Sequence, residues 1–397
     1  RESQSDKEEI KNLSIPSINL LICNLYPFKT EALEKQRPLE EAVDFIDIGG
    51  PSLIRAAAKN YMNCLPITSP DDYLKLKKAI DNGFYSLSNE DRMYYAQKAF
   101  KLTARLDLDI CHYLSNYSLK KKKQHIDKSK KLPRKISLEL SKKKELRYGE
   151  NSQQEAAVYE LFSPLEGRLE EKKDFFQIQG KDLSYNNLLD IQSATSLIAE
   201  FKEETAATFI KHNNPSGLAT SKKENLSSVL EKAYLADSKS AFGGIFACNK
   251  KIELSSAKKL SEIFLECIIA PDFSEEALEC FTRKKSLRVL KTNDLFKQKK
   301  ESELNISSFL GGFLVQSTDT FETIKTSWQK TSNKNATNHE IKDLEIAAKV
   351  AMHVKSNAIV IVKNEQTIGI GAGQMSRIDA VELAIKKAQE FSHSLSG

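Results

Sequence analysis

The stretch 208–217, Thr-Phe-Ile-Lys-His-Asn-Asn-Pro-Ser-Gly, constrains the fold more than any other part of this chain. Its β-branched and aromatic beginning predicts a short buried strand over residues 208–210. Four residues predict a turn directly after that strand: Asn213, Asn214, Pro215 and Gly217. We therefore expect Lys211 and His212 at the carboxyl end of a strand, where open α/β sheets place their ligands.

The chemistry of this pair suits a reaction that moves a proton. Histidine has an unperturbed pKa near neutrality, so His212 can accept or release a proton under physiological conditions. An adjacent ammonium group keeps its charge, so Lys211 can stabilise an oxyanion. The spacing by itself also fits a pair with a purely structural role, and the rest of the chain has to decide between the two.

The composition describes a globular protein of two or three domains. The chain has 397 residues, of which 40% are hydrophobic and 29% charged. Its apolar runs are too short to span a membrane, so we expect no membrane partner. Six cysteines lack CxxC spacing, which argues against a zinc site or a disulfide framework and fits the cytoplasm. The chain begins with Arg1 and is expected to be cut at both ends.

The net charge of +6 is concentrated in one segment. Between Lys120 and Arg147 thirteen basic residues face three acidic ones, a local net charge of +10. A nucleic-acid interface would need basic residues spread over a folded surface, so we expect no nucleic-acid partner. The charge run and Pro133 predict a solvated linker over residues 119–137.

The region before this linker reads as an α/β unit. Residues 17–28 predict a buried strand that runs into a turn carrying Asn24 and Tyr26. Further along, residues 49–52 (Gly-Gly-Pro-Ser) predict a helix N-terminus with free backbone amides, although most such sequences are plain helix caps. A second strand is predicted over residues 63–68, and Ser88 begins a long capped helix. A stripe on this helix is expected to pack in the core, and it consists of Ala96, Ala99, Phe100, Thr103 and Leu106.

After the linker, predicted strands and helices alternate to the end of the chain. Residues 369–373 (Gly-x-Gly-x-Gly) come before a helix but lack the GxGxxG spacing, which argues against a dinucleotide site. A loop of backbone amides that binds a phosphate, with Arg377 beside it, fits the same residues. Glu266 follows an apolar run, where a carboxylate fits a structural partner as well as a ligand.

Many short segments, taken together and in order, resemble the family of bifunctional purine biosynthesis enzymes that join AICAR formyltransferase to IMP cyclohydrolase. They lie at residues 24–28, 46–50, 55–60, 146–151, 184–187, 211–215, 240–244, 268–273, 354–358 and 371–377. The resemblance implies an α/β fold with an incomplete, methylglyoxal-synthase-like cyclohydrolase domain at 1–118. It also implies cytidine-deaminase-like α/β transferase subdomains at 138–397, and a homodimer.

For the second region the resemblance implies formyl transfer from 10-formyltetrahydrofolate, the cosubstrate, to the 5-amine of AICAR without a catalytic metal. His212 matches the catalytic histidine of the family, and Lys211 matches the lysine beside it. The positions that match nucleotide-binding residues are Arg147, Tyr148, Gly243, Glu266, Asn357 and Arg377. Two departures are Ser152 and Gln153, which stand where the family has proline and histidine.

For the first region the resemblance implies closure of formyl-AICAR to IMP with loss of water. Tyr26, Asp47 and Lys59 match its catalytic positions, and Asn24, Gly49 and Gly50 match substrate-binding positions. The family's opening phosphate loop, a Lys-Thr-Leu-His-Pro segment and the family's C-terminal segments are missing, so both sites are expected to be incomplete. Two alternatives stay open: a catalytically impaired nucleotide-binding or regulatory homologue, and an RNA-binding protein that uses the lysine-rich segment.

Overall fold

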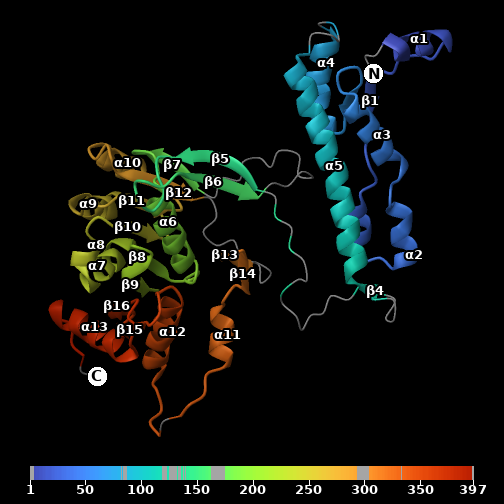
Figure 1. Ribbon diagram of the computed structural model, residues 1–397. Coiled ribbons are helices and arrows are strands. Elements are labelled where there is room, and N and C mark those ends of the chain that lie inside the picture. Colours follow the sequence, from blue (N-terminus) through green and yellow to red (C-terminus); the bar gives the residue numbers. More distant parts are fainter. Residues whose placement is uncertain are drawn as a thin grey trace. The chain divides into compact units, whose positions relative to one another are not determined.

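The computed structural model describes residues 4–81, 83, 87–118, 123–124, 132, 136, 138, 140–161, 175–292, 304–331 and 333–395. The chain divides into two compact units, which Figure 1 shows. The N-terminal unit comprises residues 1–140 with 161–170, and the C-terminal unit comprises 141–160 with 171–397. Most of the predicted linker, 119–137, lies outside the described residues.

The N-terminal unit contains a parallel strand pair, β1 (Leu20–Ile22) with β2 (Leu65–Ile67), covered by helices. Its main helices are α1 (Gln4–Asn12), α2 (Leu39–Ala42), α3 (Gly49–Lys59), α4 (Tyr73–Asp81) and α5 (Asn89–Asn116). Shorter helical turns are η1 (Lys29–Glu34), η2 (Val43–Phe45) and η3 (Pro70–Asp72), and β3 (Tyr117–Ser118) pairs with β4 (Lys123–Gln124). Both predicted strands are confirmed, each shorter than expected.

Helix α5 begins as predicted, because the Ser88 side chain accepts a hydrogen bond from the backbone N–H of Asp91. Its buried alanines, Ala96 and Ala99, pack against Ile54 of α3 and confirm the predicted core stripe at these positions. Phe100 belongs to that stripe but is partly exposed. This packing fixes α3, which carries several of the predicted site residues of this unit.

The C-terminal unit is built on a mixed sheet of eight strands in the order β15-β16-β9-β8-β10-β11-β12-β7. The strands are β7 (Phe175–Gln179), β8 (Thr205–Lys211), β9 (Asn214–Ser221), β10 (Ile245–Cys248), β11 (Cys267–Ala270), β12 (Arg288–Thr292), β15 (Ile359–Lys363) and β16 (Gln366–Gly371). Strands β10, β11 and β12 run parallel, and the other neighbouring pairs are antiparallel. The predicted α/β class is therefore confirmed. Outside this sheet lie two hairpins, β5 (Leu140–Leu146) with β6 (Ala156–Leu161), and β13 (Leu304–Phe309) with β14 (Gly312–Ser317).

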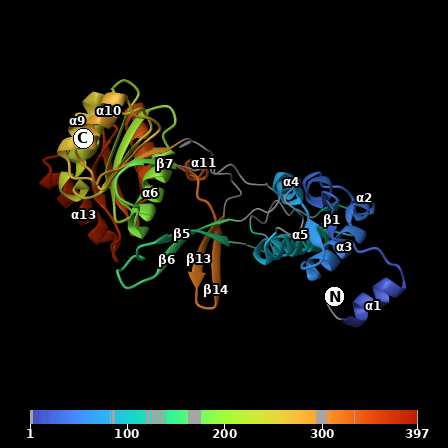
Figure 2. The same cartoon turned by 90° about the horizontal axis from the view of Figure 1, so that it is seen from above.

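Helices cover both faces of this sheet (Figure 2). One face packs against α7 (Leu226–Ala236), α9 (Leu254–Glu262) and α10 (Glu275–Thr282), and the other against α6 (Tyr185–Ile198) and α12 (Asn338–Met352). Shorter elements are α8 (Ser238–Ala241) and α11 (Phe321–Thr326), and α13 (Arg377–Glu390) packs on β16. Within the described ranges, no helix combines the length and apolar character needed to cross a bilayer.

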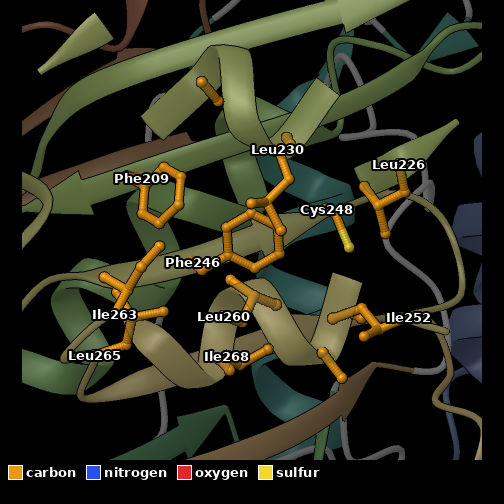
Figure 3. Close-up of a cluster of buried hydrophobic side chains, with 14 of the residues drawn as sticks. Phe209, Leu226, Leu230, Phe246, Cys248, Ile252, Leu260, Ile263, Leu265 and Ile268 are labelled. Atoms are coloured by element: carbon orange, nitrogen blue, oxygen red, sulfur yellow. The ribbon is translucent and has the colours of Figure 1, made fainter. Parts of the chain in front are cut away.

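The strand β8 shows why the sheet is covered on both sides. Its side chains alternate between two cores, because successive residues of a strand point to opposite faces. Phe209 lies in the first core with Phe246, Leu230 and Leu260 (Figure 3), and Ile210 lies in the second core beneath α6. A strand buried on both faces reads as a nearly continuous apolar run, and residues 206–210 form such a run apart from Thr208. This burial holds the end of β8, where Lys211 and His212 follow, in a fixed position.

Candidate active site

A tight turn presents His212 at the edge of the sheet. His212 and Asn213 alone connect β8 to β9, and both have positive φ angles, 51° and 61°. Positive φ at both central residues is what a type I′ hairpin turn requires. The sequence predicted a longer turn, and this was wrong: β9 already begins at Asn214. Pro215 is accommodated in the strand because the register of the ladder shifts opposite Ile210.

The edge of the sheet beyond this turn collects most of the predicted transferase residues. Lys211 ends β8, and the antiparallel strand β10 begins beside it at Ile245, two residues after Gly243. Glu266 precedes β11, Asn357 lies just before β15, and Arg377 follows β16. Lys211 and His212 lie at the carboxyl end of β8, as predicted. This edge combines the carboxyl ends of β8 and β16 with the amino ends of β10, β11 and β15.

Lys211 is held against the loop that precedes β10. Its Nζ donates a hydrogen bond of 2.6 Å to the carbonyl oxygen of Phe242. Gly243 has a φ of 73°, and its N–H donates to the carbonyl of Phe264 at 2.8 Å. The rings of Phe242 and Phe264 lie 5.0 Å apart and fix this loop. Lys211 and Gly243 are thus brought together, as the predicted site requires.

A pocket of about 460 Å³ opens next to the Lys211–His212 pair. Its lining includes four basic side chains, Lys211, His212, Lys239 and Lys387, and one carboxylate, Asp237. Lys387 Nζ lies 2.6 Å from the carboxylate of Asp237, which is almost fully buried. This ion pair neutralises the acid of the pocket, so the remaining charge favours an anionic or electron-rich ligand.

The first turns of α6 connect three parts of the site. The side chain of Asn187 donates to Glu266 Oε2 at 2.7 Å, and that of Asn186 donates to the backbone carbonyl of Glu150 at 3.2 Å. The guanidinium of Arg288 lies 3.9 Å from the same Glu266 carboxylate. Glu266 is thus partnered on two sides but half-exposed, so its carboxylate combines structural contacts with access to a ligand.

Sequence reasoning named residues 184–187 but assigned them no function. The signal was present, because Ser184 and Asn187 form a capping box that places polar amides at the start of α6. Asp190, one turn further, was missed entirely. Its carboxylate accepts a hydrogen bond of 2.6 Å from the backbone N–H of Asn213. Burial raises the pKa of the Asp190 carboxyl, opposed by the N–H groups and the histidine charge of the turn.

The loops that carry Asn357 and Arg377 are tied to the same turn. Asn214 donates to the His212 carbonyl and accepts from the Lys355 N–H, both at 3.0 Å. The Asn357 side chain donates to the carbonyls of Gln374 and Met375, at 3.0 and 3.1 Å. Arg377, exposed, begins α13 directly after these residues. The structure therefore brings the two loops together beside the His212 turn.

The glycines before α13 serve packing rather than ligand binding. A Cβ atom on Gly369 would lie 2.2 Å from the Ala384 carbonyl oxygen, and one on Gly371 would lie 2.0 Å from that of Ala380. Both glycines belong to β16 and let α13 approach the strand. The predicted anion-binding loop over 369–373 is therefore wrong for these two positions. Only Gly373, with a φ of 66°, lies in the loop beyond the strand.

Arg147 and Tyr148 follow strand β5 in an exposed loop. The guanidinium of Arg147 lies 5.5 Å from the centre of the Tyr148 ring, a stacking arrangement that leaves its N–H groups open. The loop reaches the rest of the site through Glu150, whose carbonyl accepts from Asn186. The loop of Arg147 and Tyr148 and the carboxylate of Glu266 thus both meet the first turn of α6.

In the N-terminal unit, Asp47 caps helix α3. Its Oδ1 accepts the backbone N–H of Gly50 at 2.8 Å. A Cβ atom on Gly50 would lie 2.6 Å from Asp47 Oδ2 and 2.7 Å from the side chain of Leu25, so any larger residue there would displace these two side chains. Leu25 lies between Asn24 and Tyr26, which are both exposed. The structure thus brings the predicted residues 24, 26, 47, 49 and 50 to one end of α3.

Lys59 lies at the opposite end of the same helix. It is the last residue of α3, ten positions after Gly49, which corresponds to about 15 Å along the axis. The structure therefore separates Lys59 from Asp47, whereas the sequence placed the two in one site.

Within the described part of the chain, no three His, Cys, Asp or Glu side chains gather in a way that would hold a metal ion. Comparison with known families then identifies the chain. The family model of the AICARFT/IMPCHase bienzyme matches residues 57–387. The chain belongs to this family.

Curated relatives agree with this match. Proteins named "Bifunctional purine biosynthesis protein PurH" from Aquifex aeolicus, Prochlorococcus marinus and Persephonella marina are 41%, 40% and 40% identical. The alignments cover 99%, 98% and 100% of this chain, and 73%, 73% and 74% of the relatives. A solved structure, "Crystal structure of ForH", is 32% identical over 29% of this chain and 59% of its own, with a TM-score of 0.26.

Membership of the AICARFT/IMPCHase family confirms the resemblance stated from the sequence. It also confirms the two assigned reactions, formyl transfer to AICAR and cyclisation of formyl-AICAR to IMP. It does not favour a regulatory module or an RNA-binding protein. The roles of individual residues rest on the geometry described above.

Proposed function

We propose that the C-terminal unit transfers the formyl group to AICAR and that the N-terminal unit closes the ring. One observation carries the assignment of the transferase site. A single edge of the mixed sheet gathers Lys211, His212, Gly243 and Glu266, and the loop of Asn357 is hydrogen-bonded to the same turn through Asn214.

In the first reaction, His212 acts as the general base. The 5-amine of AICAR is conjugated with the carboxamide and is a poor nucleophile, so it loses a proton as it attacks the formyl carbon. The bond between that carbon and N10 of 10-formyltetrahydrofolate then breaks, and N10 takes up a proton. Lys211 stabilises the negative charge that develops on the formyl oxygen or on N10. Its hydrogen bond to the Phe242 carbonyl sets the position of this ammonium group.

The nucleotide is held by residues around the first turns of α6 and at the start of α13. Arginine forms paired hydrogen bonds with phosphate, so Arg147 and Arg377, which are both exposed, suit the phosphate group of AICAR. Tyr148, Glu266 and Asn357 suit contacts with the remaining polar groups of the nucleotide. The basic lining of the neighbouring pocket raises the local affinity for these anionic substrates.

In the second reaction, the carboxamide nitrogen attacks the formyl carbon, and water leaves as the ring closes. Asp47 accepts a proton from the amide, Tyr26 donates a hydrogen bond, and Asn24 with Gly49 and Gly50 contacts the substrate. Because Lys59 lies at the far end of the helix, its charge acts on a different part of the substrate from Asp47.

We assign the domain boundaries and the oligomeric state by analogy with the family. We assign residues 1–118 to a methylglyoxal-synthase-like cyclohydrolase domain, 119–137 to a linker and 138–397 to cytidine-deaminase-like transferase subdomains, in a cytoplasmic homodimer. Exposed apolar side chains on the β13–β14 hairpin support a partner copy, since large apolar patches mark interfaces. The most exposed are Phe309, Leu310, Phe313 and Leu314.

The assignment is tested with the natural full-length protein, AICAR and 10-formyltetrahydrofolate. Release of tetrahydrofolate and formation of IMP are followed separately by ultraviolet absorbance. We expect His212→Ala to abolish the first signal and to leave IMP formation from supplied formyl-AICAR intact. Loss of both signals, or of neither, would contradict the division of the two reactions between the units.

A further inference from the structure

The turn that carries His212 has a conformation that its sequence does not favour. Type I′ turns prefer Asn-Gly, Asp-Gly or Gly-Gly at their two central positions, because both residues adopt positive φ. Here the central residues are His212 and Asn213, and neither is glycine. Non-glycine residues resist this region because the Cβ atom approaches the following carbonyl oxygen. Histidine and asparagine are among the residues that tolerate it best, and contacts from outside the turn add to its stability.

Asp190 supplies such a contact. Its carboxylate accepts the Asn213 N–H at 2.6 Å, a short hydrogen bond of the charge-assisted kind. Asp190 lies on α6, whose buried residues Ile191 and Ala194 are packed into the core beneath the sheet. The packing of α6 therefore holds the Asp190 carboxylate in place, and its hydrogen bond to the Asn213 N–H fixes the conformation of the turn. Asn214 secures the other side of the turn, through the His212 carbonyl.

We infer that Asp190 is a positioning residue for formyl transfer, which holds the His212–Asn213 turn in its left-handed conformation and so directs the imidazole toward the substrate. Asp190 acts through the backbone of the turn and touches no substrate. This inference rests on the proposed role of His212. It assigns to Asp190 an effect on the turnover number rather than on the binding of AICAR.

The test compares four variants of the natural full-length protein in the formyl-transfer assay. Asp190→Ala removes the acceptor, and we expect kcat to fall about 10- to 100-fold, the usual effect of losing a charged hydrogen bond. The KM for AICAR should stay within about threefold, because the proposed phosphate-binding residues do not depend on this contact. Asp190→Asn keeps an oxygen that accepts the same N–H, so its kcat should exceed that of Asp190→Ala at least fivefold or so.

The decisive variant is the double substitution Asp190→Ala with Asn213→Gly. Glycine adopts positive φ without strain, so the turn should regain its conformation and recover much of the lost kcat. A merely structural role for Asp190 predicts no such rescue. Glu203→Ala is the matched control, since Glu203 is an exposed acid that follows the same helix and pairs only with Lys222 among the described contacts. Its kcat should equal that of the wild type.

The outcomes separate the inference from the proposed function. Absence of formyl transfer in the wild type would overturn the proposed function itself. A wild type that is active, with Asp190→Ala within twofold of it, would overturn the inference alone. An effect confined to the KM would also overturn the inference. The same holds for a double variant whose kcat is no higher than that of Asp190→Ala. If Asp190→Ala lowers the melting temperature strongly, the rescue by Asn213→Gly and the retention by Asp190→Asn decide the question.

Discussion

Replacing Gly371 by alanine tests how the arginine-bearing helix α13 is seated on the sheet. The new Cβ atom would lie 2.0 Å from the carbonyl oxygen of Ala380, whereas real Cβ contacts essentially never fall below 3.0 Å. The strand and the helix must therefore separate by about 1 Å. Both contacting groups belong to the backbone, so no side-chain rotation relieves the clash. Overpacking of this kind costs about 1–3 kcal/mol, and we expect the upper end of that range.

The expected loss of stability is measurable by calorimetry. For a domain of this size, 1 kcal/mol corresponds to roughly 2–4 °C in the melting temperature, so Gly371→Ala should lower that of the C-terminal unit by about 6–12 °C. Arg377 begins the displaced helix. An error of about 1 Å in its position should raise the KM for AICAR several-fold.

The matched control is Gly311→Ala. Gly311 has open space around it, since a Cβ atom there would meet nothing within 4 Å. The melting temperature of the Gly311→Ala variant should equal that of the wild type. If Gly371→Ala melts within about 1 °C of the wild type, the close seating of α13 is refuted. A lower affinity for AICAR with an unchanged melting temperature would instead support the hypothesis that residues 369–373 form an anion-binding loop.

Three further predictions follow from the site and the burial of the thiols. His212→Ala should lower the rate of formyl transfer about 10²- to 10⁴-fold, while the affinity for AICAR measured by calorimetry stays unchanged. Activity within twofold of the wild type would show that His212 has no catalytic role. Lys59→Ala in the full-length protein should lower IMP formation from formyl-AICAR about 100-fold and spare tetrahydrofolate release; equal losses in both assays would contradict its placement. Burial raises the pKa of Cys248 to about 12, so only about one thiol in 10⁴ is ionised at pH 8. Iodoacetamide should therefore label the exposed Cys111 and leave Cys248 unmodified in the native protein, and mass spectrometry showing equal labelling would refute this.

The sequence by itself determined the local elements of this protein. The β-branched and aromatic run at 208–210 specified a short buried strand, because such residues favour the extended backbone of a half-buried or buried strand. Ser88 specified the start of α5, because a hydroxyl that accepts a backbone N–H acts within one turn of the chain. The Lys211–His212 pair at the end of β8 was likewise predictable, since the strand and the pair are adjacent in sequence. The many short segments together also identified the family.

Only the tertiary structure decided which of these elements meet. The antiparallel placement of β10 beside β8 puts Gly243 next to Lys211, and no periodicity in either strand encodes that pairing. The same holds for Asp190, which reaches Asn213 only because α6 packs beneath the sheet. Local patterns report burial and backbone preference within a few residues. Strand order depends on the packing of segments far apart in the chain, so the contacts that build the site come from the fold.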